Sequence, residues 1–230
     1  MRGMKLSMVS WMLGMLGGIT LWCVSATAAV LTPLSYDMVN GNGQAVGGTF
    51  NYWDKNYTGT GDTMVDGAPL SGGLGDLTDG VTTTLNWINI ENDAGTGPYV
   101  GWLEIDPTIT FHFSGVTAYQ QINVHLDDSD VGGVSAPASI TVSDGTTSMT
   151  FPVTDPGFQQ PPFLASLDVS GLGLSGDTIM VTLHRNNLWV FADEISFVGT
   201  TVAEPVPEPA TVTLCTLGVL GLALVRRWRA

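Results

Sequence analysis

Hydrophobic and polar residues alternate along several segments in the middle of the chain. "TITFHF", "QINVHL", "SITVS", "TIMVTLH" and "EISFVG" place an apolar residue at every second position, such as Ile109, Phe111 and Phe113 in the first segment. A period of two predicts strands with one buried face. Turn-forming clusters such as "DDSDVGG", "SDGTT" and "DPGFQQPP" separate these segments. Signals for long helices are nearly absent, so the pattern predicts an all-β fold, an antiparallel β-sandwich or jelly roll.

Two longer apolar runs lie at the ends of the chain and have a different meaning. At the N-terminus, Arg2 and Lys5 precede an apolar stretch at residues 8–24, and an A-x-A pattern ends at Ala28. This order of parts is typical of a secretory signal. We therefore expect a signal-peptide helix over residues 1–28, cleaved after Ala28, and export of the protein.

The C-terminal run begins after a proline-rich spacer. Residues 201–209 form a predicted linker that ends in Pro-Glu-Pro, and residues 210–225 carry no charge. A basic cluster then closes the chain at Arg226, Arg227 and Arg229. Basic residues beside an apolar run are typical of the cytoplasmic face of a membrane, although this run is shorter than the ~20 residues of a comfortable span. The pattern predicts a transmembrane helix and basic tail over 210–230; the alternative is a buried C-terminal helix.

The order of Pro207, Glu208 and Pro209, the apolar stretch and the terminal arginines resembles the PEP-CTERM sorting signal of bacterial proteins. That resemblance implies export, transient anchorage in the inner membrane and processing at the Pro-Glu-Pro motif by an exosortase-type enzyme. It also implies a destination at the cell surface or outside the cell, in bacteria that make extracellular polysaccharide.

Composition narrows the function classes for residues 29–200. The chain has 21 Asp and Glu against 7 Lys and Arg, and only Lys55 and Arg185 among the basic residues lie outside the end segments. So acidic a domain argues against nucleic acid and against anionic lipid headgroups as partners. Both cysteines, Cys23 and Cys215, also lie in the end segments, so the domain has no disulfide.

Two further stretches, "LTDGVTTTLNW" and "VFADEISFVG", resemble the galactose-binding-like β-sandwiches, which include discoidin-type domains and carbohydrate-binding modules. Asp79 of an Asp-Gly pair, followed by Thr84 and Trp87, matches an early motif of these domains. Glu194 on the last predicted strand matches a late one. The resemblance covers about residues 77–199 and implies a single module of this type.

In that family the Asp, the Thr and the late Glu help to hold a structural Ca²⁺. The resemblance therefore implies Asp79, Thr84 and Glu194 as metal ligands, and Ca²⁺ does prefer six to eight oxygen ligands. Val81 stands where the family often has Asn or Asp, so only its carbonyl could contribute. The alternative is that Asp79 is an ordinary turn residue and Glu194 a solvated strand residue.

Two other acidic stretches are weaker candidates for cation binding. One has the oxygen spacing of an EF-hand loop without its flanking helices or its final Glu, at Asp54, Asn56, Thr58, Gly59 and Asp62. The other is "DDSD", in which Asp127, Asp128 and Asp130 form either a cation site or a solvated turn.

The stretch "LHRNNLWVF" is the candidate for ligand recognition. Arg185, Asn186 and Trp189 combine a cation, an amide and an aromatic face, which is the chemistry of sugar-binding loops. The alternative places Trp189 in the core and pairs Arg185 with a carboxylate. Other polar or aromatic residues available for the same task are Trp53, Tyr57, His125, His184 and Asn187.

Catalytic signatures are missing from the sequence. There is no G-x-S-x-G elbow, no pair of histidines at metal-binding spacing and no cysteine nucleophile in the domain. We therefore expect a non-catalytic module that associates with extracellular polysaccharide or the cell envelope, as in biofilm formation. Two alternatives stay open: a small extracellular polysaccharide hydrolase, and a structural matrix protein that binds no sugar.

Overall fold

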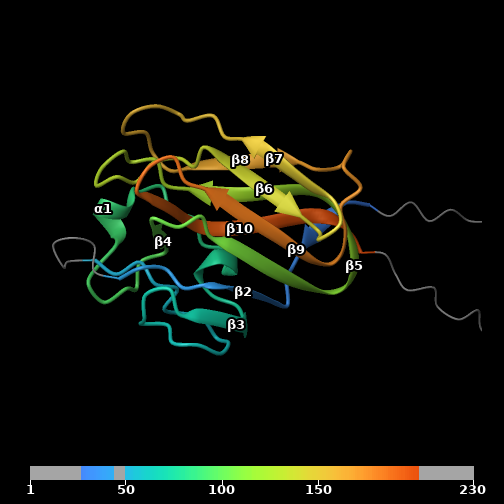
Figure 1. Ribbon diagram of the computed structural model, residues 1–230, viewed down its shortest axis with the longest axis horizontal. Helices are drawn as coiled ribbons and strands as arrows, with labels where there is room; N and C mark the ends of the chain where they lie inside the picture. The colour runs from blue at the N-terminus through green and yellow to red at the C-terminus, as the bar shows by residue number, and fades with distance from the viewer. Residues whose placement is uncertain (1–26, 44–49, 202–230) are drawn as a thin grey trace, which may run out of the picture.

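A computed structural model describes residues 27–43 and 50–201 (Figure 1). Strands dominate this part of the chain, with one short 3-10 helix and one short α-helix. In chain order the elements are β1 (Ala29–Leu31), β2 (Ser35–Val39), β3 (Pro69–Gly73), η1 (Asp76–Thr78), α1 (Trp87–Ile90), β4 (Val100–Leu103), β5 (Thr108–Leu126), β6 (Ser139–Ser143), β7 (Ser148–Pro152), β8 (Phe163–Asp168), β9 (Ser175–His184) and β10 (Trp189–Thr201).

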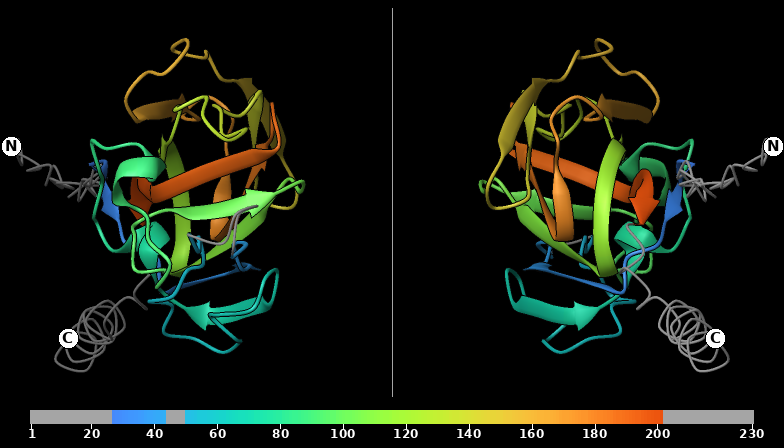
Figure 2. Two further views of the ribbon diagram at one scale, coloured as in Figure 1. Left: turned by 90° about the vertical axis from the view of Figure 1, so that its left-hand side faces the viewer. Right: turned by 90° about the vertical axis from the view of Figure 1, so that its right-hand side faces the viewer.

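The long strand β5 belongs to both layers of the sandwich. Its first part pairs with β2 and β9, and its second part pairs with β8 and β10. One layer therefore has the order β7-β6-β9-β5-β2-β3, and the other consists of β8, β5 and β10 with β1 and β4 on the far side of β10. Every pairing is antiparallel, and Figure 2 shows the layers from two sides.

The sequence pattern treats "TITFHF" and "QINVHL" as two strands, whereas the structure joins them in β5. The pairing with β9 shifts register between His112 and Thr117, so the chain bends there instead of turning. Strands that pass from one sheet of a sandwich to the other commonly do so at such an irregularity. The bend replaces the turn that we expected.

The core lies between the layers, as the alternation predicts. Ile109 and Phe111 of β5 face Ile195 and Phe197 of β10, and all of them are buried. The rings of Phe111 and Phe197 meet at a centroid distance of 4.7 Å. Aromatic pairs of this kind contribute beyond the area that they bury, about 0.5–1.5 kcal/mol each. The predicted all-β antiparallel sandwich is confirmed.

The described chain begins and ends at the same side of the molecule. Ala29 of β1 is the register partner of Gly199 of β10, so both ends lie beside each other, away from α1 (Figure 1). Apart from residues 27, 28 and 201, the predicted signal peptide, linker and C-terminal segment lie outside the described residues. None of the helices within 27–43 and 50–201 has the length and apolar character to span a bilayer.

Candidate functional site

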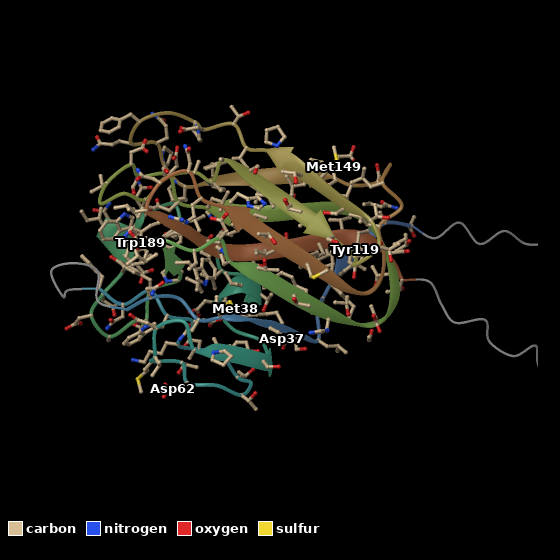
Figure 3. All side chains as sticks on the ribbon, in the orientation of Figure 1. Asp37, Met38, Asp62, Tyr119, Met149 and Trp189 are labelled. Carbon is tan, nitrogen blue, oxygen red and sulfur yellow. The ribbon has the colours of Figure 1, made fainter. Side chains whose placement is uncertain are left out.

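A cavity of about 420 Å³ lies at the end of the sandwich opposite the chain ends (Figure 3, around the label for Trp189). Its walls come from residues far apart in the sequence, because β4, β10, α1 and four loops meet at this end. The lining residues are Tyr52, Trp87, Leu103, Glu104, Gly132, Val134, Leu188, Trp189 and Phe191. Four aromatic rings among nine lining residues make the cavity largely apolar.

Tyr52 is the centre of the aromatic group that forms these walls. Its ring lies 5.7 Å from Trp87, 5.2 Å from Trp189 and 4.6 Å from Phe191, measured between centroids. The interplanar angles of 88°, 77° and 50° are those of edge-to-face and tilted pairs. These mutual contacts fix the positions of the rings, so the shape of the cavity is set before a ligand arrives.

Two polar groups in the cavity wall, the Tyr52 hydroxyl and the Trp189 indole N–H, make no hydrogen bond to a described residue. Their side chains are otherwise buried, since Tyr52 is 1% exposed and Trp189 is 6% exposed. The indole N–H of Trp87, in contrast, donates to the Ser129 hydroxyl at 2.9 Å. A hydroxyl and an indole N–H can each donate a hydrogen bond, so both groups are available to a ligand.

The rim of the cavity combines a charge with exposed apolar surface. Glu104 lies there with φ = 56°, a left-handed conformation that is uncommon outside glycine. Its backbone N–H donates to the carbonyl of Leu188 at 2.8 Å, and Leu188 itself is exposed. The bond between these backbones holds the loop after β4 against the loop before β10.

Of the three predicted ligand-binding residues, the cavity includes Trp189 but neither Arg185 nor Asn186. Trp189 is buried, as the core alternative proposed, and it lines the cavity as well. Arg185 pairs with Asp106 at 3.2 Å and also donates to the carbonyl of Asn187. Asn186 is exposed. Sequence reasoning missed Tyr52 and Phe191 because nothing local marks them as neighbours of Trp189.

The predicted metal ligands lie around a second pocket, of about 450 Å³. Asp79 and Thr84 line it, and Glu194 reaches the same loop, where it accepts a hydrogen bond from the Gly80 N–H at 2.9 Å. Burial, together with the nearby carboxylates of Asp79 and Asp193, raises the pKa of Glu194 to about 7. A cation between the first loop and the last strand would relieve this repulsion.

The same loop is tied to β10 by a neighbouring carboxylate. Asp193, fully buried, accepts from the Thr83 backbone N–H at 2.9 Å and pairs with the His125 imidazole at 2.5 Å. The loop is therefore held to β10 by two adjacent acidic residues, of which only Glu194 was predicted.

A further buried carboxyl faces this pocket. Asp76 is 2% exposed; one of its oxygens accepts from the Asn56 amide at 2.8 Å, while the other has no partner among the described residues. Burial and the neighbouring Asp54 raise its pKa to about 7. Asp54 itself accepts from the Tyr36 hydroxyl and the Asp76 backbone N–H, and burial raises its pKa to about 6.

The residues with EF-hand-like spacing do not form a single cation-binding loop, because their side chains make hydrogen bonds to different partners. Asp54 and Asn56 bond to the groups just described, and the Thr58 hydroxyl donates to the Leu74 carbonyl. Within the described ranges, no set of three or more His, Cys, Asp or Glu side chains is placed to hold a metal ion. A cation bound anywhere in the described part of the chain would therefore need hydroxyl or carbonyl oxygens as ligands besides carboxylates.

The expectation that "DDSD" is a solvated turn is wrong for its first two residues. Asp127 and Asp128 are fully buried, because the loop folds under Trp87. Neither oxygen of Asp127 makes a hydrogen bond of ordinary geometry, and burial raises its pKa to about 7. Nearby, burial raises the pKa of Glu91 to about 8, with Asp76 and Asp127 adding repulsion.

Solved structures with a similar arrangement include several carbohydrate-binding modules. A truncated AlyQ with CBM32 and alginate lyase domains is 11% identical, with a TM-score of 0.43 over 81% of this chain and 37% of that one. The GH31 CBM32-2 bound to GalNAc is 13% identical, with a TM-score of 0.35 over 71% and 96%. The family 32 module of C. perfringens NanJ in complex with galactose is 6% identical, with a TM-score of 0.31 over 44% and 75%.

This chain thus spans little more than a third of the truncated AlyQ structure. No curated protein matches the sequence. A family model does match: the DS-like domain of discoidin domain-containing receptors 1 and 2 aligns with residues 33–199, most of the chain. The predicted discoidin-type sandwich is therefore confirmed, and this chain belongs to the discoidin DS-like domain family.

Proposed function

We propose that this protein is an exported, non-catalytic module that binds a glycan in the aromatic cavity. The observation that carries the proposal is the pairing of rigid aromatic walls with two unpartnered polar groups, the Tyr52 hydroxyl and the Trp189 indole N–H. Sugars have apolar C–H faces that pack on aromatic rings and hydroxyls that need directional partners. This cavity offers both.

The cellular setting of the proposal comes from the two ends of the chain. The signal-peptide pattern ending at Ala28 supports export, and the Pro207–Pro209 motif with its apolar run and arginines supports exosortase sorting. The protein would be anchored briefly in the inner membrane and then reach the cell surface or the extracellular polysaccharide, which is the source of glycan that we propose.

Replacing Tyr52 by Phe is expected to weaken glycan binding about fivefold without lowering the melting temperature. The hydroxyl has no partner in the described structure, so its removal breaks no internal bond, whereas a bound sugar would lose a hydrogen bond worth about 1 kcal/mol. Glycan-array screening followed by calorimetry on the best ligand measures the first effect, and thermal unfolding the second.

Tyr119→Phe is the matched control. The Tyr119 hydroxyl donates to the Gly176 carbonyl at 3.2 Å, far from the cavity. This variant is expected to lose about 1 kcal/mol of stability and to keep full glycan binding. A blank array for the wild type would instead favour a matrix protein, and hydrolysis of an array glycan would favour an enzyme.

We also propose that Ca²⁺ binds between Asp79, Thr84 and Glu194. Addition of Ca²⁺ near pH 8 is expected to raise the melting temperature, because binding to the folded state alone is stabilising by about 2.7 kcal/mol at a hundredfold excess over Kd. Asp79→Ala should abolish the rise, while the exposed Asp62→Ala should leave it intact. Equal melting temperatures in Ca²⁺ and in EDTA would contradict the metal site.

A further inference from the structure

Four threonines form a straight row across one layer of the sandwich. Thr108 of β5 is the register partner of Thr182 of β9, which is in turn the partner of Thr141 of β6, itself the partner of Thr150 of β7. Their neighbours in each strand, such as Ile109 and Val181, point into the core. Since side chains alternate along a strand, all four threonines point outward on the same face.

The hydroxyls in this row are held in place by one another. Thr108 and Thr182 share a hydrogen bond of 2.8 Å between their hydroxyl oxygens, and Thr141 and Thr150 share another of 2.8 Å. Thr141 also lies 2.7 Å from the His184 imidazole. A hydroxyl carries one donor and two acceptor sites, so each pair keeps unused capacity that faces solvent.

This face, which we term the threonine face, has no Asp, Glu, Lys or Arg at its outward positions in β5, β9, β6 or β7. Those positions hold Ser, Thr, His, Met, Pro and Gly only. The carboxylates beside the face have partners: Asp37 bonds to His112 at 2.8 Å, Asp106 bonds to His184 and to Arg185, each at 3.2 Å, and Asp177 accepts from the Thr178 hydroxyl at 3.3 Å. In a chain with 21 acidic residues, an uncharged sheet face is unexpected.

The geometry of the row suits a single extended chain. Neighbouring strands lie about 4.8 Å apart, so four threonines span roughly 14 Å. Sheets twist by about 20–25° from strand to strand, which prevents a close match to a flat crystalline surface. A flexible polymer that crosses the strands can follow that twist and meet one hydroxyl and one methyl group at each step.

We propose that the threonine face is a second binding surface, which takes an extended, uncharged polysaccharide along the row from Thr108 to Thr150. The ligand class rests on the proposed function, but the surface is separate from the aromatic cavity. The proposed ligand is neutral because the acidic domain would repel a polyanion, and the cation beside this face, Arg185, is already paired with Asp106. Hydroxyls and methyl groups at regular spacing match the edges and faces of neutral sugars.

The test compares the migration of the purified full-length protein in native gels that contain hydroxyethylcellulose, galactomannan or alginate. The wild type is expected to be retarded by at least one neutral polymer and not by alginate. The double variant Thr141→Glu/Thr182→Glu should bind that polymer about tenfold more weakly, because each new carboxylate would have to lose water of hydration to a neutral ligand. Thr141→Val/Thr182→Val, which keeps the shape and removes the hydroxyls, should also weaken binding.

Ser166→Glu/Ser196→Glu is the matched control, since both serines point outward on the other layer as register partners of Asn123. It should bind like the wild type. Retardation that survives both threonine variants but is lost in Tyr52→Phe would overturn this inference and leave the cavity proposal standing. No retardation of the wild type by either neutral polymer would also overturn it, whatever the cavity binds. Retardation that depends on the threonines but not on Tyr52 would support it even if the cavity binds nothing.

Discussion

Lowering the pH from about 9 to about 5, with divalent cations removed, is expected to stabilise the folded protein by a few kcal/mol. Three buried carboxyls and the half-buried Glu194 cause most of the effect: the pKa values are raised to about 7 for Asp76, Asp127 and Glu194 and to about 8 for Glu91. In the unfolded chain such groups titrate near pH 4. The folded state therefore binds protons more tightly than the unfolded state.

The sign follows from that difference. A carboxyl with a raised pKa contributes its full stability below about pH 4 and loses it as the pH rises through its folded value, here between about 7 and 8. Most acid-sensitive proteins behave in the opposite way, because their carboxylates are stabilised as anions. Urea unfolding at several pH values, with fluorescence of the tryptophans as the signal, measures the trend directly.

Glu91→Gln is the decisive variant for this expectation. Glu91 accepts from the Tyr99 backbone N–H at 2.9 Å, and a glutamine oxygen can accept the same bond without a charge. The variant should therefore be more stable than the wild type at about pH 9 and show a flatter pH profile. Asp168→Asn is the control: hydrogen bonds from Ser170 lower the pKa of Asp168, so its stabilising effect is lost only in strong acid. An unchanged profile in Glu91→Gln would refute the assignment.

Phe191→Ala is expected to cost about 3–5 kcal/mol in stability, the range for emptying a buried aromatic site. Phe191 is 1% exposed, lines the cavity and contacts the rings of Tyr52, Trp87 and Trp189, so its loss would enlarge the cavity inward. The neighbouring rings would lose their support, and glycan binding should fall together with stability.

Two controls separate packing from mere loss of a phenyl ring. Phe191→Leu keeps most of the volume and should cost far less. Phe158→Ala removes a ring that is 71% exposed and should change the unfolding free energy by less than about 0.5 kcal/mol. Chemical denaturation gives all three values. A Phe191→Ala protein as stable as the wild type would show that this cluster does not support the cavity.

The strand pattern of the sequence predicted most of the fold because a period of two reports burial directly. It failed where "TITFHF" and "QINVHL" proved to be one strand, since the residues between His112 and Thr117 carry the chain from one layer to the other without ending the strand. Periodicity marks which residues are buried, but it does not distinguish a turn from a strand that changes sheet.

The site was less predictable because it depends on contacts between distant segments. Trp189, which the sequence singled out, lines the cavity, yet its partner Tyr52 comes from a loop more than a hundred residues earlier. The sequence placed Asp127 in either a cation site or a solvated turn and did not single out Asp76, and only the fold shows that both are buried. Burial of a charged residue leaves no local signal, because the sequence around it remains polar.

The antiparallel pairing of β10 with β5 has a mechanical consequence. If the C-terminal segment tethers the protein as proposed, tension from a ligand held by Trp189 and Phe191 would enter β10 at one end and leave at Thr201. That direction runs along the strand, so the backbone hydrogen bonds between β10 and β5, from Ala192 to Thr201, would be loaded together in shear. A strand pulled lengthwise resists far more than one peeled from its end, so a protein tethered in this way would resist unfolding under tension.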